Sequence, residues 1–217
     1  MVYIFVINLD NDTKRFEKFK NHDIIRWKAT HYSELSIDDP IIEKMISYWN
    51  IRHTNQHLCK IGCFLSHTKL WKHIIDNQLN NVLILEDDAV GDLNIDISKF
   101  NTDGITYLGG YICKKGKLTK SKKCNYEFNF KHGINIVDND NFMITMTMSY
   151  YIPTYTLLKQ LYDKIVNCKR YRAIDIMICN TDIKKYFVYP AIFTEEKVES
   201  TIRGKKKYSN KFYEIEK

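Results

Sequence analysis

Short apolar runs and longer amphipathic segments alternate along most of this chain. Apolar runs bounded by polar residues are typical of buried strands, and apolar residues at every third or fourth position are typical of helices that pack on one face. The pattern predicts strands at residues 2–7, 24–28, 82–85, 106–109, 142–152 and 186–189, and helices at 12–20, 41–49, 61–79, 153–165 and 173–180. This alternation favours an α/β fold with a mainly parallel central sheet flanked by helices.

The most informative local feature is an aliphatic strand that runs directly into three acids. Residues 82–85 are followed by Glu86, Asp87 and Asp88. The strand is expected to be buried on both faces, and α/β sheets bind ligands at the carboxyl ends of such strands. Adjacent carboxylates are unfavourable there unless a partner neutralises them. A divalent cation is the expected partner, and a solvated acidic turn is the alternative.

Carboxylate oxygens of this kind suit Mn²⁺ or Mg²⁺. Alternate side chains of a strand share a face, so we expect Glu86 and Asp88 on one face and Asp87 on the other. We expect Asp88 to contact the metal, and Glu86 to reach the metal or a ribose through water. A cation held in this way would neutralise the diphosphate leaving group of a nucleotide-linked substrate.

Composition narrows the class of protein. The 217 residues are 44% hydrophobic and 13% aromatic, and the net charge is +7. These values predict one folded domain over residues 1–217, whose basic surface favours anionic partners. The lysine clusters at 114–123 and 205–207 fit solvated loops. The sequence has no recognisable signal peptide and no apolar stretch of transmembrane length, so we expect a cytoplasmic-type soluble protein in an otherwise unknown compartment.

The six cysteines form no CxxC pair, which argues against a zinc ribbon. Cys59 and Cys63 lie four residues apart, with Gly62 between them. We expect reduced thiols, and a disulfide between Cys113 and Cys124 across the basic loop is the alternative.

Three blocks occur in order along the chain. They are Val6-Ile7-Asn8-Leu9-Asp10 with Arg15 beyond, Ile61-Gly62-Cys63-Phe64-Leu65-Ser66-His67 with Trp71 beyond, and Ile84-Leu85-Glu86-Asp87-Asp88-Ala89. With weaker matches at 149–152, 173–175 and 200–202, the set resembles glycosyltransferase family 25, which includes lipooligosaccharide galactosyltransferases and collagen hydroxylysine glycosyltransferases. The order and spacing of the blocks are more specific than any one of them. The resemblance implies a GT-A-like fold and a UDP-sugar donor.

The same resemblance implies roles for individual residues. Asn8, Leu9 and Arg15 would line the nucleotide pocket, with Asn8 reading uracil and Arg15 pairing with phosphate. Ser66 would contact the donor, together with Glu86 and Asp87. His67 would hydrogen-bond the donor or hold an acid in place. The structural alternatives are a strand end at Asn8, a solvated helix face at Arg15 and a packing role for His67; Trp71 is expected in the core.

Asp175 is the best candidate for chemistry on the acceptor. It lies between Ile174 and Ile176, far along the chain from the acidic run. An inverting transfer needs a carboxylate that takes the proton of the acceptor hydroxyl. A helix-capping role is the alternative, and a retaining reaction would need no such base.

The leading hypothesis is a metal-dependent transferase that moves glucose or galactose from UDP to a hydroxyl acceptor. Collagen hydroxylysine or galactosylhydroxylysine is the preferred acceptor, although no acceptor-site residue supports that choice, and a lipooligosaccharide or polysaccharide acceptor is the alternative. From another class, the chain could be a non-catalytic module whose basic surface binds nucleic acid or acidic glycan. The acidic run argues against nucleic acid as a partner. A homodimer is left open.

Overall fold

The computed structural model describes residues 1–36, 38–49, 55–100, 102–115 and 130–196 of the chain. The strands are β1 (Tyr3–Asn8), β2 (Ile25–Lys28), β3 (Val82–Glu86), β4 (Ala89–Gly91), β5 (Ile105–Tyr107), β6 (Tyr111–Lys114), β7 (Gly133–Ile136), β8 (Phe142–Thr145), β9 (Ser149–Ile152), β10 (Lys185–Tyr189) and β11 (Phe193–Glu195). The α-helices are α1 (Thr13–Phe16), α2 (Pro40–Trp49), α3 (Asn55–Asp76), α4 (Tyr155–Val166) and α5 (Ile174–Cys179), with short 3₁₀ helices η1 (Glu17–Phe19), η2 (Tyr32–Glu34) and η3 (Ile97–Phe100).

Seven strands form one central sheet in the order β2-β1-β3-β9-β5-β10-β7. The strands β1, β2, β3, β5 and β10 run in one direction, whereas β9 and β7 run against their neighbours. Two small antiparallel pairs, β11-β4 and β6-β8, lie beside this sheet. The mixed α/β architecture confirms the predicted fold class and is consistent with a GT-A-like fold.

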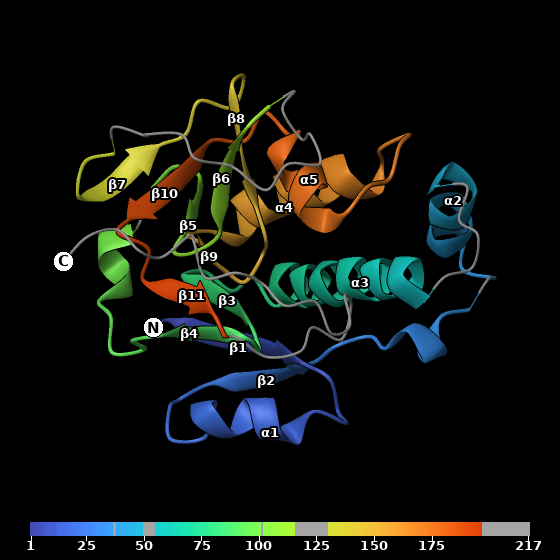
Figure 1. Cartoon of the computed structure of the whole chain (residues 1–217), viewed down its shortest axis with the longest axis horizontal. Coiled ribbons are helices and arrows are strands. Elements are labelled where there is room, and N and C mark those ends of the chain that lie inside the picture. Colours follow the sequence, from blue (N-terminus) through green and yellow to red (C-terminus); the bar gives the residue numbers. More distant parts are fainter. Residues whose placement is uncertain (37, 50–54, 101, 116–129, 197–217) are drawn as a thin grey trace.

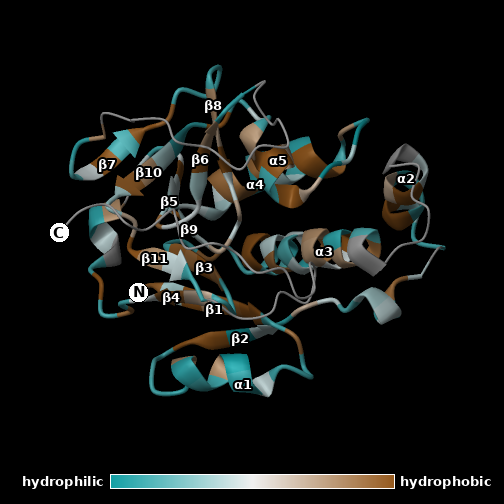
Figure 2. Cartoon of the chain, in the orientation of Figure 1, coloured by the Kyte–Doolittle hydropathy of each residue, from teal (hydrophilic) through white to brown (hydrophobic). Residues whose placement is uncertain are grey.

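The central strands are buried on both faces because their apolar side chains alternate between two cores. Phe5 and Ile84 face the larger core, which the helices α3, α4 and α5 cover. Val6 and Leu83 face a second core that includes Phe19 of η1. In Figure 2 the strands β1 and β3 are largely brown, and the short helix α1 is largely teal. The prediction of a strand buried on both faces at residues 82–85 is confirmed.

One predicted strand is wrong in extent. Residues 142–152 form two strands, β8 and β9, because the chain breaks at Met146, where φ is +74°. Left-handed backbone at a residue with a side chain is uncommon and needs support from its surroundings. The Asp175 carboxylate supplies it, since Oδ2 accepts a hydrogen bond from the Met146 amide at 3.1 Å.

The topology brings the ends of two strands to one place. Ile7 of β1 pairs with Glu86 of β3, so the residues that follow both strands share one edge of the sheet. The N-terminal half of α3 lies next to this edge (Figure 1). Among the residues that the structure describes, no helix is long and apolar enough to cross a membrane.

Candidate active site

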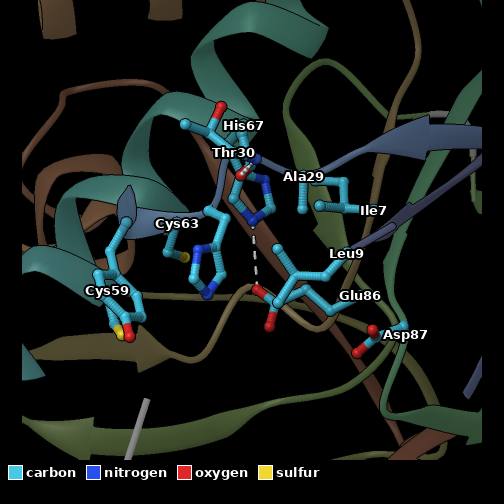
Figure 3. Close-up of a pocket in the computed structure, with 12 residues that line it drawn as sticks. Ile7, Leu9, Ala29, Thr30, Cys59, Cys63, His67, Glu86 and Asp87 are labelled. Carbon is cyan, nitrogen blue, oxygen red and sulfur yellow. Dashed lines mark hydrogen bonds and ion pairs between the residues drawn. The ribbon is translucent and has the colours of Figure 1, made fainter. Parts of the chain in front are cut away.

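A pocket opens at the carboxyl ends of β1 and β3 (Figure 3). Its wall comes from the end of β1, the segment after β2, the helix α3 and the end of β3: Ile7, Leu9, Ala29, Thr30, His31, Tyr32, Cys59, Cys63, Ser66, His67, Glu86 and Asp87. Five residues that the sequence assigned to the site therefore line one pocket: Leu9, Ser66, His67, Glu86 and Asp87. Asn8 and Arg15 bind the Asp87 carboxylate, whereas Asp88 and Asp175 do not belong to this wall.

Asn8 ends β1 and holds Asp87 in place. Its side-chain Nδ2 donates to Asp87 Oδ2 at 2.8 Å and to the backbone oxygen of Asp12 at 2.9 Å, and its Oδ1 accepts from Arg26 Nε at 2.8 Å. Asn8 is 1% exposed, and both of its amide hydrogens are engaged within the protein. The geometry thus gives its side chain a positioning role toward Asp87 and leaves no amide hydrogen to read a base.

Arg15 pairs with two carboxylates. Its Nη1 lies 3.0 Å from Asp87 Oδ1, and its Nε lies 3.0 Å from Asp12 Oδ2. The side chain is 13% exposed, so the alternative of a solvated helix face does not hold. Asp12 precedes α1, and its side chain makes no capping hydrogen bond to this helix. Burial raises the pKa of Asp87, against the lowering effects of Asn8 and Arg15.

His67 is part of a buried chain of hydrogen bonds that ends at Glu86. Trp71 Nε1 donates to Tyr150 Oη at 2.8 Å, Tyr150 Oη lies 2.8 Å from His67 Nδ1, and His67 Nε2 lies 3.2 Å from Glu86 Oε1. Since Trp71 can only donate, the Tyr150 hydroxyl hydrogen is available to His67 Nδ1, and the proton on Nε2 then points at Glu86. Burial raises the pKa of Tyr150 well above its usual range, so the hydroxyl keeps this hydrogen.

This chain of contacts orients the Glu86 carboxylate. Oε1 accepts a hydrogen bond from Thr147 Oγ1 in addition to its contact with His67. Two fixed partners on one oxygen restrict the rotation of the carboxyl group toward the pocket. His67 is thus placed to hold an acid, one of the two roles expected for it.

Ser66 ties α3 to the segment after β2. Its Oγ donates to the Gly62 oxygen at 2.7 Å and accepts from the Thr30 amide at 2.8 Å. The helix approaches so closely that a Cβ on Gly62 would lie 2.6 Å from the Thr30 oxygen. Gly62 and Ser66 therefore set the width of the pocket at this wall, and the described contacts of the Ser66 hydroxyl are with backbone groups.

Asp88 follows Asp87 along the chain and lies in surroundings that disfavour its charge. Its Oδ1 is buried and has no hydrogen-bond partner among the residues that the structure describes. Burial, followed by the charges of Glu86, Asp87 and Glu195, raises the pKa of Asp88 to about 8. A buried carboxylate oxygen without a donor, beside other carboxylates, is the environment that a bound cation would relieve.

The residues present therefore fit a hard divalent cation. Asp88 offers an oxygen that no described residue contacts by a hydrogen bond, and Glu86 offers a carboxylate whose orientation is fixed by His67. The three acids do not alternate between two faces of a strand, as was expected. The strand β3 ends at Glu86, and the next two residues, Asp87 and Asp88, lie in a turn. As a result Glu86 and Asp87 both line the pocket.

Asp175 lies in the first turn of α5. Its Oδ2 accepts from the Met146 amide at 3.1 Å, and its Oδ1 accepts from the Ile176 amide at 2.8 Å. These contacts are structural, as in the capping alternative. Burial, followed by the charges of Glu86, Asp175 and Asp88, raises the pKa of the Cys63 thiol, so Asp175 lies within electrostatic reach of the pocket.

Sequence reasoning missed several residues of the site. Tyr150 and Thr147 orient His67 and Glu86, and Glu195 of β11 adds a carboxylate near Asp88. Tyr150 stood in a weakly matching block, but no local signal linked it to His67. The weakly matching block at 200–202 and Cys124 lie outside the described residues, so the alternative of a Cys113–Cys124 disulfide stays a prediction.

The fold and the acidic pocket define a GT-A-like α/β protein, and comparison with known proteins identifies its family. The sequence profile of glycosyltransferase family 25, described as an LPS biosynthesis protein family, matches residues 1–178. The chain therefore belongs to glycosyltransferase family 25.

Individual relatives match over shorter stretches. A glycosyltransferase 25 family member of Drosophila melanogaster is 33% identical over 96 residues, which cover 39% of this chain and 16% of that protein. A family member of Anopheles gambiae is 30% identical over 96 residues, covering 40% of this chain and 16% of that protein. Procollagen galactosyltransferase 2 of Homo sapiens is 55% identical over 30 residues, which are 14% of this chain and 5% of that protein. Each match thus spans less than a fifth of the relative's length.

Proposed function

We propose that this protein is a metal-dependent glycosyltransferase that moves glucose or galactose from a UDP-sugar to a hydroxyl acceptor. The observation that carries the proposal is the partly buried run Glu86-Asp87-Asp88 at the carboxyl ends of β1 and β3, in which Asp88 Oδ1 has no donor within the described part of the chain. Family membership supports the class of reaction. The metal, the donor and the acceptor are parts of the proposal.

Asp88 and Glu86 are the proposed ligands of Mn²⁺ or Mg²⁺. Such a cation supplies charge neutralisation to a diphosphate leaving group. The protein contributes fixed geometry: His67 and Thr147 hold Glu86, while Asn8 and Arg15 hold Asp87. Because these positioning bonds are made before a donor binds, the carboxylates need little reorganisation during the reaction.

The nucleotide is proposed to occupy the pocket beside these acids. Ile7 and Leu9 offer an apolar wall, and the rings of His31 and Tyr32, whose centroids lie 4.2 Å apart, stand at another side. A pocket that is mostly apolar with a few convergent polar groups is typical of nucleotide and small-ligand sites. Arg15 contributes positive charge close to the acids.

Asp175 is the proposed base for an inverting transfer. Each of its oxygens accepts one amide hydrogen bond and retains a second lone pair for the proton of an acceptor hydroxyl. Collagen hydroxylysine or galactosylhydroxylysine is the proposed acceptor, which the similarity to procollagen galactosyltransferase 2 supports over a short stretch. A lipooligosaccharide acceptor is the alternative within the same reaction class.

The experiment that tests the proposal measures UDP release. The protein is incubated with UDP-galactose or UDP-glucose and Mn²⁺, with and without a collagen-like peptide or a lipooligosaccharide core acceptor. We expect slow donor hydrolysis alone and faster release with the correct acceptor. If no UDP is released from either donor under any of these conditions, the proposal is wrong.

Two variants separate the metal site from the acceptor side. Asp88→Ala should abolish Mn²⁺-dependent donor binding, because it removes the carboxylate whose Oδ1 has no partner among the described residues. Asp175→Asn should leave donor binding intact and reduce transfer to the acceptor, by roughly 10²–10⁴-fold if the carboxylate acts as a general base. Unchanged transfer in Asp175→Asn would assign this residue to the capping role alone.

A further inference from the structure

A second cluster of metal-ligating atoms includes Glu86 but neither Asp87 nor Asp88. The Cys63 Sγ, a ring nitrogen of His67 and a carboxylate oxygen of Glu86 all lie within 4.8 Å of one another. Cys63 and His67 are four residues apart on α3, so they share one face of the helix. Figure 3 shows both side chains reaching toward Glu86 from the helix side of the pocket.

We propose that Cys63, His67 and Glu86 form a binding site for a zinc-class divalent cation, which shares Glu86 with the proposed Mn²⁺ or Mg²⁺ position at Asp88. Thiolate and imidazole ligands favour Zn²⁺, whereas Mn²⁺ and Mg²⁺ prefer oxygen ligands. Zinc sites with three protein ligands and a fourth position open to water are well known in proteins. All three residues line the pocket, which gives an ion a path of entry.

The surroundings of His67 support this assignment. Zinc-binding histidines usually have a hydrogen-bond partner on the ring nitrogen that faces away from the metal. Tyr150 Oη lies 2.8 Å from Nδ1 and is itself fixed by Trp71 Nε1 at 2.8 Å. Nε2, on the other side of the ring, faces Glu86.

Binding of the zinc-class cation requires proton movements at His67 and Cys63. As Nε2 coordinates the cation, the ring proton of His67 moves from Nε2 to Nδ1 and is donated to the Tyr150 oxygen, and the Tyr150 hydroxyl turns its own hydrogen away from His67. The Cys63 thiol loses its proton to solvent as the sulfur–zinc bond forms. Glu86 exchanges its contact with His67 for the cation and is drawn toward α3.

The proposed consequence is inhibition, and this consequence rests on the proposed transferase function. A zinc ion at Cys63 would occupy pocket volume and remove Glu86 from the position proposed for the donor-side metal. Submillimolar zinc should then suppress Mn²⁺-dependent UDP release, and a chelator selective for zinc should restore it.

The binding test does not depend on activity. Co²⁺, a spectroscopic substitute for Zn²⁺, should give a sulfur-to-cobalt charge-transfer band in the near ultraviolet when added to the wild-type protein, and Zn²⁺ should displace it. The band should disappear in Cys63→Ser and persist in the matched variant Cys59→Ser, which removes another thiol of the same pocket. No band in the wild-type protein, or a band that survives in Cys63→Ser, would overturn the inference.

A measurement on the unmodified protein guards against variants that do not fold. Zn²⁺ should slow alkylation of Cys63 by iodoacetamide relative to Cys59, as measured by mass spectrometry of the peptides. Equal rates at Cys63 with and without zinc would contradict the site. Tyr150→Phe should weaken zinc binding by about 10–100-fold, as expected when the partner of a ligating histidine is lost.

The inhibitory consequence is tested separately by the ratio of UDP release with and without zinc in wild type and Cys63→Ser. This ratio should lie below one in the wild type and close to one in Cys63→Ser. If no UDP is released under any condition, the proposed function fails while the cobalt band still decides the zinc site. If the band is present and zinc leaves turnover unchanged, the claim of inhibition is wrong.

Discussion

Asp88 is a carboxyl group whose acidic neighbours all oppose its ionisation. Glu86, Asp87 and Glu195 raise its pKa together with burial, and Arg15 lowers it. The pKa moves from 3.8 to about 8 in the folded protein, so the folded state binds a proton that the unfolded state releases. The contribution of Asp88 to the free energy of unfolding is therefore fully present below about pH 4 and declines as the pH rises toward about 8.

Asp88→Asn should remove this dependence. We expect the melting temperature of the metal-free wild type to fall between about pH 5 and pH 8. The melting temperature of the variant should fall much less over the same range. Thermal unfolding followed by circular dichroism in chelator-treated buffer measures both. Asp23→Asn, at an exposed position, is the control and should follow the wild-type curve. A wild-type curve that is flat over this range would contradict the raised pKa.

Asn8 offers a second test at the scale of one residue. Asn8 is 1% exposed, and its side chain bonds Asp87 Oδ2 and Arg26 Nε. Asn8→Ala removes both of these hydrogen bonds. Loss of buried hydrogen-bond partners typically costs about 1–3 kcal/mol. Urea unfolding should show a loss of that size, and exposed Asn77→Ala should change stability much less. An equal loss in the two variants would argue against the positioning role.

At the scale of elements, one hydroxyl joins α3, β9 and the end of β3. Tyr150→Phe removes the partner of both Trp71 Nε1 and His67 Nδ1, and should destabilise the protein by about 1–3 kcal/mol. Tyr107 on the neighbouring strand β5 is equally buried, but its hydroxyl has no hydrogen-bond partner within the described ranges. Tyr107→Phe should therefore be neutral or stabilising in the same urea unfolding measurement, and a loss equal to that of Tyr150→Phe would contradict the network.

Gly62 tests how closely α3 packs on the segment after β2. Inside a helix, alanine is usually more stable than glycine by roughly 0.5–1 kcal/mol. Here the added Cβ would lie 2.6 Å from the Thr30 backbone oxygen. Gly62→Ala should therefore destabilise the protein, by about 1–3 kcal/mol as for other overpacked sites. A gain in the urea midpoint would show that the helix moves away without cost.

The sequence was sufficient to predict most of the central sheet and its helices, because their apolar patterns are long and regular. It was insufficient for β4, β6, β7 and β11, which are three or four residues long and pair with distant segments. The break at Met146 depends on Asp175, 29 residues away. The acidic run was visible as a local pattern, whereas the link from Trp71 through Tyr150 to Glu86 required the tertiary structure.

At the scale of the whole molecule, the net charge of +7 coexists with an acidic pocket. A basic surface attracts anions from a distance, but the carboxylates of Glu86, Asp87 and Asp88 repel a diphosphate at short range. The two effects are reconciled if a cation binds first. Nucleotide binding should therefore require metal in spite of the favourable overall charge.

Thermal shift can test this order of binding. UDP at about 100 times its dissociation constant adds about 2.7 kcal/mol to the stability of the native state. For a chain of this size each kcal/mol raises the melting temperature by about 2–4 °C, so we expect an increase of roughly 5–10 °C. The increase should appear with UDP and Mn²⁺ together and should be absent with UDP alone and in Asp88→Asn with both. An equal shift by UDP without any divalent cation would show that the basic surface, rather than a metal at the acidic run, holds the nucleotide.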